Sequence, residues 1–108
     1  MNVLVTGCAG FIASHVCRTL ASRGDRVVGV DNLNDAYDPR LKDWRLRNLA
    51  DAGVIEAHRA DINDDGEMER LFAENSFDAV INLAARAGVP QSLADPAEYY
   101  PTNTLGTL

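Results

Sequence analysis

NVLVTGCAGFIASHVCRTLASRG, residues 2–24, is the stretch of sequence that decides the fold. Its first five residues are mostly apolar and β-branched without strict alternation, which predicts a strand buried on both faces. Gly7 and Gly10 then break the strand. Between Phe11 and Arg23 apolar residues recur every fourth position, as they do along the buried stripe of a helix. The stretch therefore predicts a strand, a tight glycine turn and a helix in direct succession.

The rest of the chain repeats this alternation of strand and helix. We expect strands at residues 26–30, 54–59 and 78–83, and helices from Pro39 to about Ala52, after Asp64, and from Pro96 to the end. Asp38 and Asp95 each precede a proline, and Asp64 stands three residues before Glu67, so all three predict helix N-caps. Short connections between such elements indicate βαβ units. The sequence predicts an α/β fold, a Rossmann-type parallel sheet with flanking helices, truncated after about four strands.

The end of the chain falls inside the last predicted helix, whereas a doubly wound sheet usually has six strands or more. We therefore expect residues 1–108 to be the N-terminal part of a larger domain. The fourth strand would lie near the middle of the complete sheet, so one of its edges is unpaired in these residues. An exposed apolar edge invites pairing with another chain, which predicts self-association or partial order.

Composition narrows the class of protein. A chain of 108 residues with 46% hydrophobic and 24% charged residues is typical of one globular domain. Its net charge of −6 disfavours nucleic acid as a partner. It has neither a membrane-spanning apolar run nor the basic start of a signal peptide, so we expect a cytoplasmic protein without a membrane partner. Cys8 and Cys17 lack partners at metal-ligand spacing, which predicts buried, reduced thiols and no metal site.

The glycine turn is a candidate phosphate-binding site. A nucleotide pyrophosphate needs close approach to the backbone, free N–H groups and the positive end of a helix dipole. Gly7 permits the sharp turn, and Gly10 removes a side chain from the place where phosphates would lie. An ordinary glycine turn is the alternative, but the position between the first strand and the first helix favours dinucleotide binding.

Asp31 ends the second strand, about twenty residues beyond the turn, where dinucleotide-binding folds carry an acidic residue. A carboxylate there can accept hydrogen bonds from both hydroxyls of the adenosine ribose. Its charge would repel a 2′-phosphate by about 2 kcal/mol in water at a separation of about 4 Å. The position therefore favours NAD over NADP as the cofactor, with a simple strand-end turn aspartate as the alternative.

Five stretches together resemble one family, the extended short-chain dehydrogenase/reductases: TGCAGFIAS, VVGVDNLNDAYDPRLKDWRL, RADI, INLAARAGVPQSLADP and YYPTNTLGT. Within it they are most similar to the NAD-dependent nucleotide-sugar epimerases and dehydratases, and above all to the UDP-glucuronate 4-epimerases. The resemblance covers essentially the whole chain. It implies that these residues are the N-terminal part of an NAD-binding Rossmann domain, and that the catalytic and substrate-binding part lies beyond them. One departure is Ala13, where the family usually has glycine.

The resemblance also implies roles for individual residues. The pyrophosphate would be lined by Gly7, Gly10, Phe11 and Ile12, and the adenosine ribose would be contacted by Asp31 and Asn32. The adenine would be held by Asp61 and Ile62. The segment beneath the cofactor would be Leu83, Ala84 and Ala85, with Arg86 near the diphosphate. Asp61 could instead cap the next helix, and Arg86 could be a surface arginine.

The other polar and aromatic residues have simpler interpretations. Arg40, Lys42, Arg45 and Arg47 could face an acidic sugar nucleotide, but a solvated helix face is the interpretation we favour. We expect Tyr99 and Tyr100 to be packing residues.

Enzymes of the resembled family oxidise a sugar carbon by transient hydride transfer to NAD, with a tyrosine as the base and a lysine four residues later. No such pair occurs in this chain, because its one lysine, Lys42, follows Asp38 at that spacing. We therefore expect no catalytic residue among these 108 and an inactive fragment, whose full-length parent is a homo-oligomer acting on a nucleotide sugar. Another reaction of the same scaffold (a dehydratase, decarboxylase or reductase) and a non-catalytic NAD-binding module remain alternatives.

Overall fold

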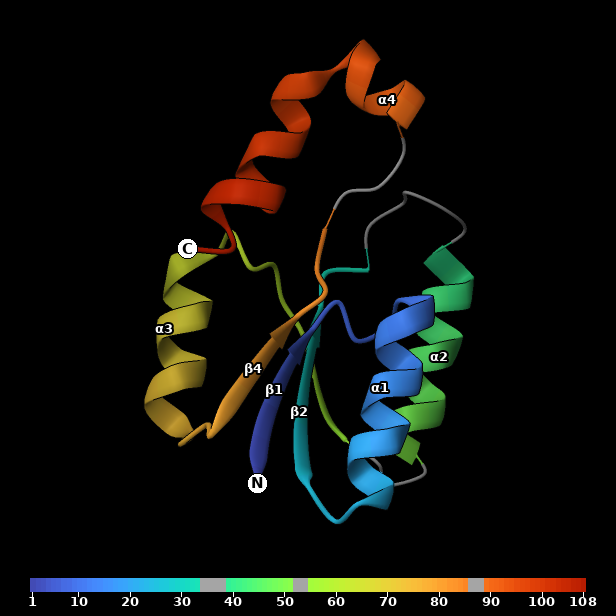
Figure 1. Ribbon diagram of the computed structural model, residues 1–108, viewed down its shortest axis with the longest axis vertical. Coiled ribbons are helices and arrows are strands. Elements are labelled where there is room, and N and C mark those ends of the chain that lie inside the picture. The colour runs from blue at the N-terminus through green and yellow to red at the C-terminus, as the bar shows by residue number, and fades with distance from the viewer. Residues whose placement is uncertain (34–38, 52–54, 86–88) are drawn as a thin grey trace.

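The computed structural model describes residues 1–33, 39–51, 55–85 and 89–108. Strands and helices alternate along the chain up to the last strand, and further helical segments follow it (Figure 1). The strands are β1 (Asn2–Thr6), β2 (Arg26–Asp31), β3 (Glu56–Arg59) and β4 (Ala79–Asn82). The helices are α1 (Phe11–Ser22), α2 (Pro39–Asp51), α3 (Asp65–Glu74) and α4 (Val89–Ala94), with a 3₁₀ turn η1 (Pro96–Glu98) and a π-helical turn η2 (Pro101–Leu105).

The described strands form one four-stranded parallel sheet in the order β3-β2-β1-β4. Thr6 at the end of β1 lies level with Val30 of β2 and with Asn82 of β4. The carboxyl ends of these three strands therefore meet at one edge of the sheet, where ligands bind in open α/β folds. The predicted α/β fold of the Rossmann type is confirmed. β4 is an outer strand among the described residues, as the sequence predicted.

Helices cover both faces of the central strands β1 and β2, whose buried residues point alternately to the two sides of the sheet. On one side the β1 residues Val3 and Val5 pack with residues of α1 and α2, and on the other Leu4 packs with residues of β2 and α3. Figure 1 shows α1 and α2 on one side of the sheet and α3 on the other. The prediction that the first strand is buried on both faces is confirmed.

Helix ends differ in part from the prediction. The side chain of Asp64 accepts a hydrogen bond from Glu67 N at 3.1 Å and caps α3, as expected. Asp95 stands at the predicted N-cap position, but its side chain makes no capping hydrogen bond. Asp38 lies outside the described residues.

The segment after β4 also differs. α4 was not predicted, and Pro96 opens a 3₁₀ turn that gives way to η2 rather than one regular α-helix. Pro101 explains part of this, because proline has no N–H to donate and disrupts the regular helical hydrogen bonding before it. A hydrogen bond from Asn63 to Thr102, 3.1 Å, joins the segment to the loop after β3, and one from Asn82 to Thr107, 3.0 Å, joins it to β4. None of the helices in the described parts of the chain is long and apolar enough to cross a membrane.

Candidate functional site

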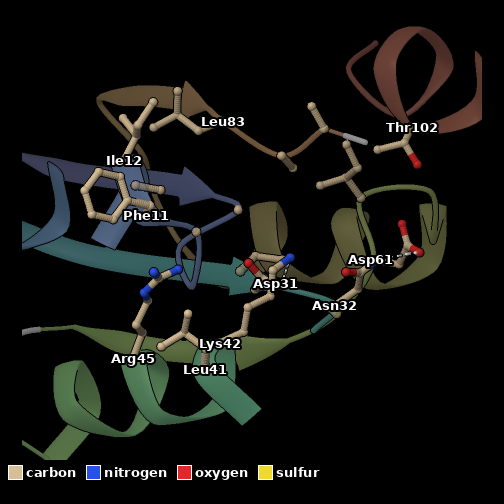
Figure 2. A pocket seen from close by; sticks show the side chains of 18 residues that line it. Phe11, Ile12, Asp31, Asn32, Leu41, Lys42, Arg45, Asp61, Leu83 and Thr102 are labelled. Atoms are coloured by element: carbon tan, nitrogen blue, oxygen red, sulfur yellow. Dashed lines mark hydrogen bonds and ion pairs between the residues drawn. The ribbon is translucent and has the colours of Figure 1, made fainter. Parts of the chain in front are cut away.

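A pocket of about 560 Å³ lies at the carboxyl ends of β1, β2 and β4 (Figure 2). Eleven of the twelve residues that the sequence marked as cofactor contacts line it: Gly7, Gly10, Phe11, Ile12, Asp31, Asn32, Asp61, Ile62, Leu83, Ala84 and Ala85. The twelfth, Arg86, lies outside the described residues. Residues from the glycine turn, from the ends of three strands and from α2 thus surround one space.

The glycine turn forms the part of the wall beside α1. Gly7 has φ +70°, a left-handed conformation that side chains rarely adopt, and Gly10 N donates to Gly7 O at 2.9 Å. The N-cap residue of α1 is Gly10, and neither a capping side chain nor an acidic residue occupies this helix end. The first N–H groups of a helix have no partner within it, and they carry the positive end of its dipole. The turn therefore presents donors and partial positive charge to the pocket.

Thr6 holds the floor of the pocket, a role that the sequence analysis missed. Its hydroxyl donates to Asn82 Oδ1 and accepts hydrogen bonds from Leu83 N at 3.1 Å and Ala84 N at 3.2 Å. A Cβ atom on Gly7 would lie 2.8 Å from the carbonyl carbon of Leu83, so the chain after β4 passes directly against the turn. The Leu83–Ala84 backbone is thus fixed from two sides.

Asp31 lies at the end of β2 and is only 5% exposed. Its Oδ2 accepts a hydrogen bond from Ala9 N at 3.1 Å, and its Oδ1 accepts one from Leu33 N at 2.7 Å. The second bond holds Leu33 at φ 55°, which is unusual for a residue with a branched side chain. Asp31 is therefore a turn aspartate, and it also ties the glycine turn to β2 and lines the pocket. A role in the turn is therefore compatible with a role in binding the adenosine ribose.

The ends of β2 and β3 are joined by side chains at the far end of the pocket. Asn32 Nδ2 donates to Asp61 Oδ2 at 3.2 Å, and Asp61 Oδ1 accepts from Asn63 N at 2.9 Å. The alternative that Asp61 caps the next helix is wrong, because Asp64 is the N-cap of α3. Ile62, 8% exposed, supplies an apolar surface beside Asp61.

The basic residues of α2 divide into two groups, which corrects the expectation of a wholly solvated face. Lys42 and Arg45 line the pocket, whereas Arg40 and Arg47 are exposed, and Arg47 pairs with Asp43 at 3.0 Å. Lys42 is 8% exposed, and its Nζ lies 4.0 Å from Asp31 Oδ1.

Arg45 reaches the glycine turn from α2. Its guanidinium lies 5.7 Å from the centre of the Phe11 ring, and its Nη1 donates to Ala9 O at 3.4 Å. In Figure 2 the side chains of Arg45 and Lys42 rise from α2 toward the turn and Asp31. Two cations therefore stand beside the turn and the strand end, a pattern suited to an anionic ligand.

Two aromatic or polar residues near the end of the chain differ from expectation. Tyr100 is 66% exposed, so its prediction as a packing residue is wrong, whereas Tyr99 is half-buried. Thr102 of η2 lines the pocket and was not predicted. The reason is that the helical segment after β4 returns toward the strand ends, a long-range arrangement without a local sequence signal.

The two cysteines are both free and buried, as predicted. Burial raises the pKa of the Cys17 thiol to about 11 and raises that of Cys8 still further, so both thiols are protonated near neutral pH. Cys8 packs over β2 at Gly29, where an added Cβ would lie 2.8 Å from its Sγ. Both cysteines belong to the core rather than to the chemistry of the pocket.

Comparison with known proteins agrees with the resemblance found in the sequence. The family model described as GDP-mannose 4,6 dehydratase matches residues 4–108. The UDP-glucuronate 4-epimerase of Thermodesulfobacterium geofontis is 48% identical over 105 residues, which cover 97% of this chain and 32% of that protein. UDP-glucuronate 4-epimerase 3 of Arabidopsis thaliana is 45% identical, over 97% of this chain and 24% of that protein.

Solved structures agree in fold. The UDP-glucuronic acid 4-epimerase of Bacillus cereus, in complex with UDP-glucuronic acid and NAD, superposes with a TM-score of 0.86 at 32% identity, over 99% of this chain and 34% of that one. The chain thus spans about a third or less of the length of these relatives. The match over residues 4–108 confirms the resemblance to the nucleotide-sugar epimerases and dehydratases, and the chain belongs to the family that the GDP-mannose 4,6 dehydratase model describes.

Proposed function

We propose that the pocket binds NAD and that the chain is the cofactor-binding part of a nucleotide-sugar epimerase, acting on UDP-glucuronate or a related UDP-sugar. The observation that carries the proposal is the N-terminal end of α1. There Gly10 provides no capping side chain, and the pocket is lined by Phe11, Ile12 and Ala13. Donors at such a helix end suit a pyrophosphate. Relatives and solved structures that bind NAD and UDP-sugars support the choice of ligand.

The residues present fit a dinucleotide. Gly10 has no side chain to occupy the space before the helix end, and Asp31 supplies carboxylate oxygens at the strand end. Asp61 and Ile62 would hold the adenine, and Leu83, Ala84 and Ala85 would lie beneath the nicotinamide half, with Arg86 near the diphosphate. NAD, when bound, supplies a hydride acceptor that can return the hydride to the sugar. The chain's own residues bind and orient the cofactor.

We propose that these 108 residues bind the cofactor without catalysing the reaction themselves. The family's tyrosine and lysine stand four residues apart, and the chain's one lysine, Lys42, is buried beside Asp31 instead. Proton transfer at the sugar would therefore fall to residues outside this sequence. A non-catalytic NAD-binding module is the second candidate, since the pocket itself calls only for cofactor binding.

The net charge of the chain and its exposed apolar side chains indicate which partners the protein has. A net charge of −6 disfavours a nucleic-acid partner. We also propose that the protein is cytoplasmic. Self-association is supported by exposed apolar side chains after β4, since Leu93 is 80% exposed and Leu105 66% exposed. We therefore propose a homo-oligomer.

A pair of alanine variants tests cofactor binding. In Gly10→Ala the new Cβ would lie 3.0 Å from Gly7 O within the turn that lines the pocket, whereas in Gly66→Ala on α3 it would meet only Asp64 Oδ1 at 3.6 Å. Calorimetry should show NAD binding to the original chain and to Gly66→Ala, and weaker binding to Gly10→Ala. Equal affinity in all three, or no binding by the folded chain, would refute the proposal.

A further inference from the structure

The pairing of Lys42 with Asp31 is the feature of the pocket that the proposed function leaves unused. Lys42 Nζ lies 4.0 Å from Asp31 Oδ1, and the two residues are 8% and 5% exposed (Figure 2). Lysine is rarely buried to this degree in proteins, because its ammonium group loses hydration. The pair also faces a ligand pocket, since both residues line it.

Asp31 does not depend on Lys42 for its position. Its two carboxylate oxygens accept hydrogen bonds from the backbone at Ala9, 3.1 Å, and at Leu33, 2.7 Å. These bonds fix the carboxylate between the glycine turn and the end of β2. A neutral side chain at position 42 would therefore leave the carboxylate in place and change mainly the charge around it.

The charge balance at this end of the pocket is the property that Lys42 controls. Without Lys42, the Asp31 carboxylate would give the strand end a full negative charge. With the ammonium 4.0 Å away, an incoming anion meets a pair of opposite charges. Interactions between charges at such distances are appreciable even in water and stronger in a partly buried pocket.

We infer that Lys42 is a specificity-determining residue whose ammonium offsets the Asp31 carboxylate and so sets how strongly the pocket excludes a ligand with a phosphate on the adenosine 2′-oxygen. The inference rests on the proposed function, because it requires the adenosine ribose of the dinucleotide to lie at Asp31. It means that exclusion of NADP is a property of the pair rather than of Asp31 alone. Removing either charge should therefore shift selectivity, and the two shifts should have opposite signs.

The test compares one quantity between variants of the 108-residue chain, the ratio of the dissociation constant of NADP to that of NAD. Both constants are measured by calorimetry. Lys42→Met removes the cation and should raise this ratio about fivefold or more, which is the size of the effect of one unit charge on another about 4 Å away in water. Asp31→Asn keeps an oxygen that can accept from the backbone and should lower the ratio by at least as much. Lys42→Arg keeps the charge and should leave the ratio within about twofold of the original.

Arg47→Met is the matched control. It removes one positive charge from the same helix, but Arg47 is exposed and paired with Asp43 at 3.0 Å. We expect it to leave the ratio unchanged. Circular dichroism and thermal melting establish that each variant is folded, and Lys42→Gln provides the same loss of charge if methionine at the buried position is not tolerated.

The outcomes are distinct. A folded Lys42→Met or Lys42→Gln protein with an unchanged or lower ratio overturns the inference while NAD binding by the original chain still supports the proposed function. If the folded original chain binds neither dinucleotide, the proposed function fails and the inference fails with it. A higher ratio in the neutral variants, a lower one in Asp31→Asn and no change in Arg47→Met support the inference.

Discussion

Gly7 approaches Leu83 so closely that a Cβ atom on Gly7 would lie 2.8 Å from the Leu83 carbonyl carbon and carbonyl oxygen. This contact joins the turn after β1 to the chain after β4 across 76 residues of sequence. The hydroxyl of Thr6 strengthens the same junction, because it accepts hydrogen bonds from Leu83 N and Ala84 N. The floor of the pocket therefore depends on one glycine and one threonine that are adjacent in sequence.

The Gly7→Ala substitution should destabilise the chain by more than the backbone conformation alone explains. Gly7 has φ +70°, and an alanine there would carry about 1 kcal/mol of backbone strain and would also clash with backbone atoms. Gly24→Ala is the matched control, since Gly24 has φ +89° with nothing within 4 Å of an added Cβ. Urea unfolding should show a clearly larger loss of stability for Gly7→Ala, and equal losses would contradict the close contact.

Thr6→Val should lower the free energy of unfolding by about 1–3 kcal/mol, because it keeps the shape of the side chain but leaves the partners of the hydroxyl without it. Those partners are Asn82 Oδ1, Leu83 N and Ala84 N. Thr19→Val is the control, since the Thr19 hydroxyl makes one exposed bond to His15 O within α1. If urea unfolding gives the two variants the same stability, the hydroxyl of Thr6 does not hold the pocket floor.

Ala13→Gly should leave the affinity for NAD unchanged or increase it. Ala13 is 2% exposed and lies where α1 packs on the sheet beside the pocket, so the loss of its methyl group allows helix and strand to approach. Stability should fall by about 1 kcal/mol, as for glycine in a helix. Calorimetry and thermal melting measure the two effects separately. A clear loss of affinity in a folded variant would contradict this interpretation of the turn.

The outer edge of β4 should mediate self-association of the 108-residue chain. β4 pairs with β1 on one side and has no second neighbour among the described strands, and Val80 is 49% exposed. Val80→Lys should reduce association measured by light scattering at high concentration, since charges protect sheet edges. Trp44→Lys, on α2 and 62% exposed in the original, should not. A monodisperse monomer of the original chain would contradict the prediction.

The glycine turn and the strand ends could be predicted from sequence because their signals are local. The apolar run of β1, the glycines after it and the acidic residue at the end of β2 lie within the first 31 residues. In a parallel sheet the carboxyl ends of the strands share one edge, so these residues are brought together by the fold class itself. Hence eleven predicted residues line one pocket.

Lys42 and Arg45 were not predicted to line the pocket, because charges on a helix usually face solvent. A signal was nevertheless present. Lys42 stands four residues before Leu46 and seven before Leu49, and both leucines pack in the core, so Lys42 falls on the apolar stripe of α2. The partners that bring this stripe to the strand end, β2 and the glycine turn, are distant in sequence, and periodicity alone does not reveal them.

The measurement that tests the central claim most directly is a titration of the ¹⁵N-labelled 108-residue chain with NAD, followed by backbone amide chemical shifts. The account predicts saturable shifts at Gly7, Gly10 and Phe11, at Asp31 and at Leu83–Ala85, with little change on the far side of the molecule in α3. Shifts confined to residues away from the pocket, or none at all in the folded chain, would contradict the assignment of this pocket to NAD.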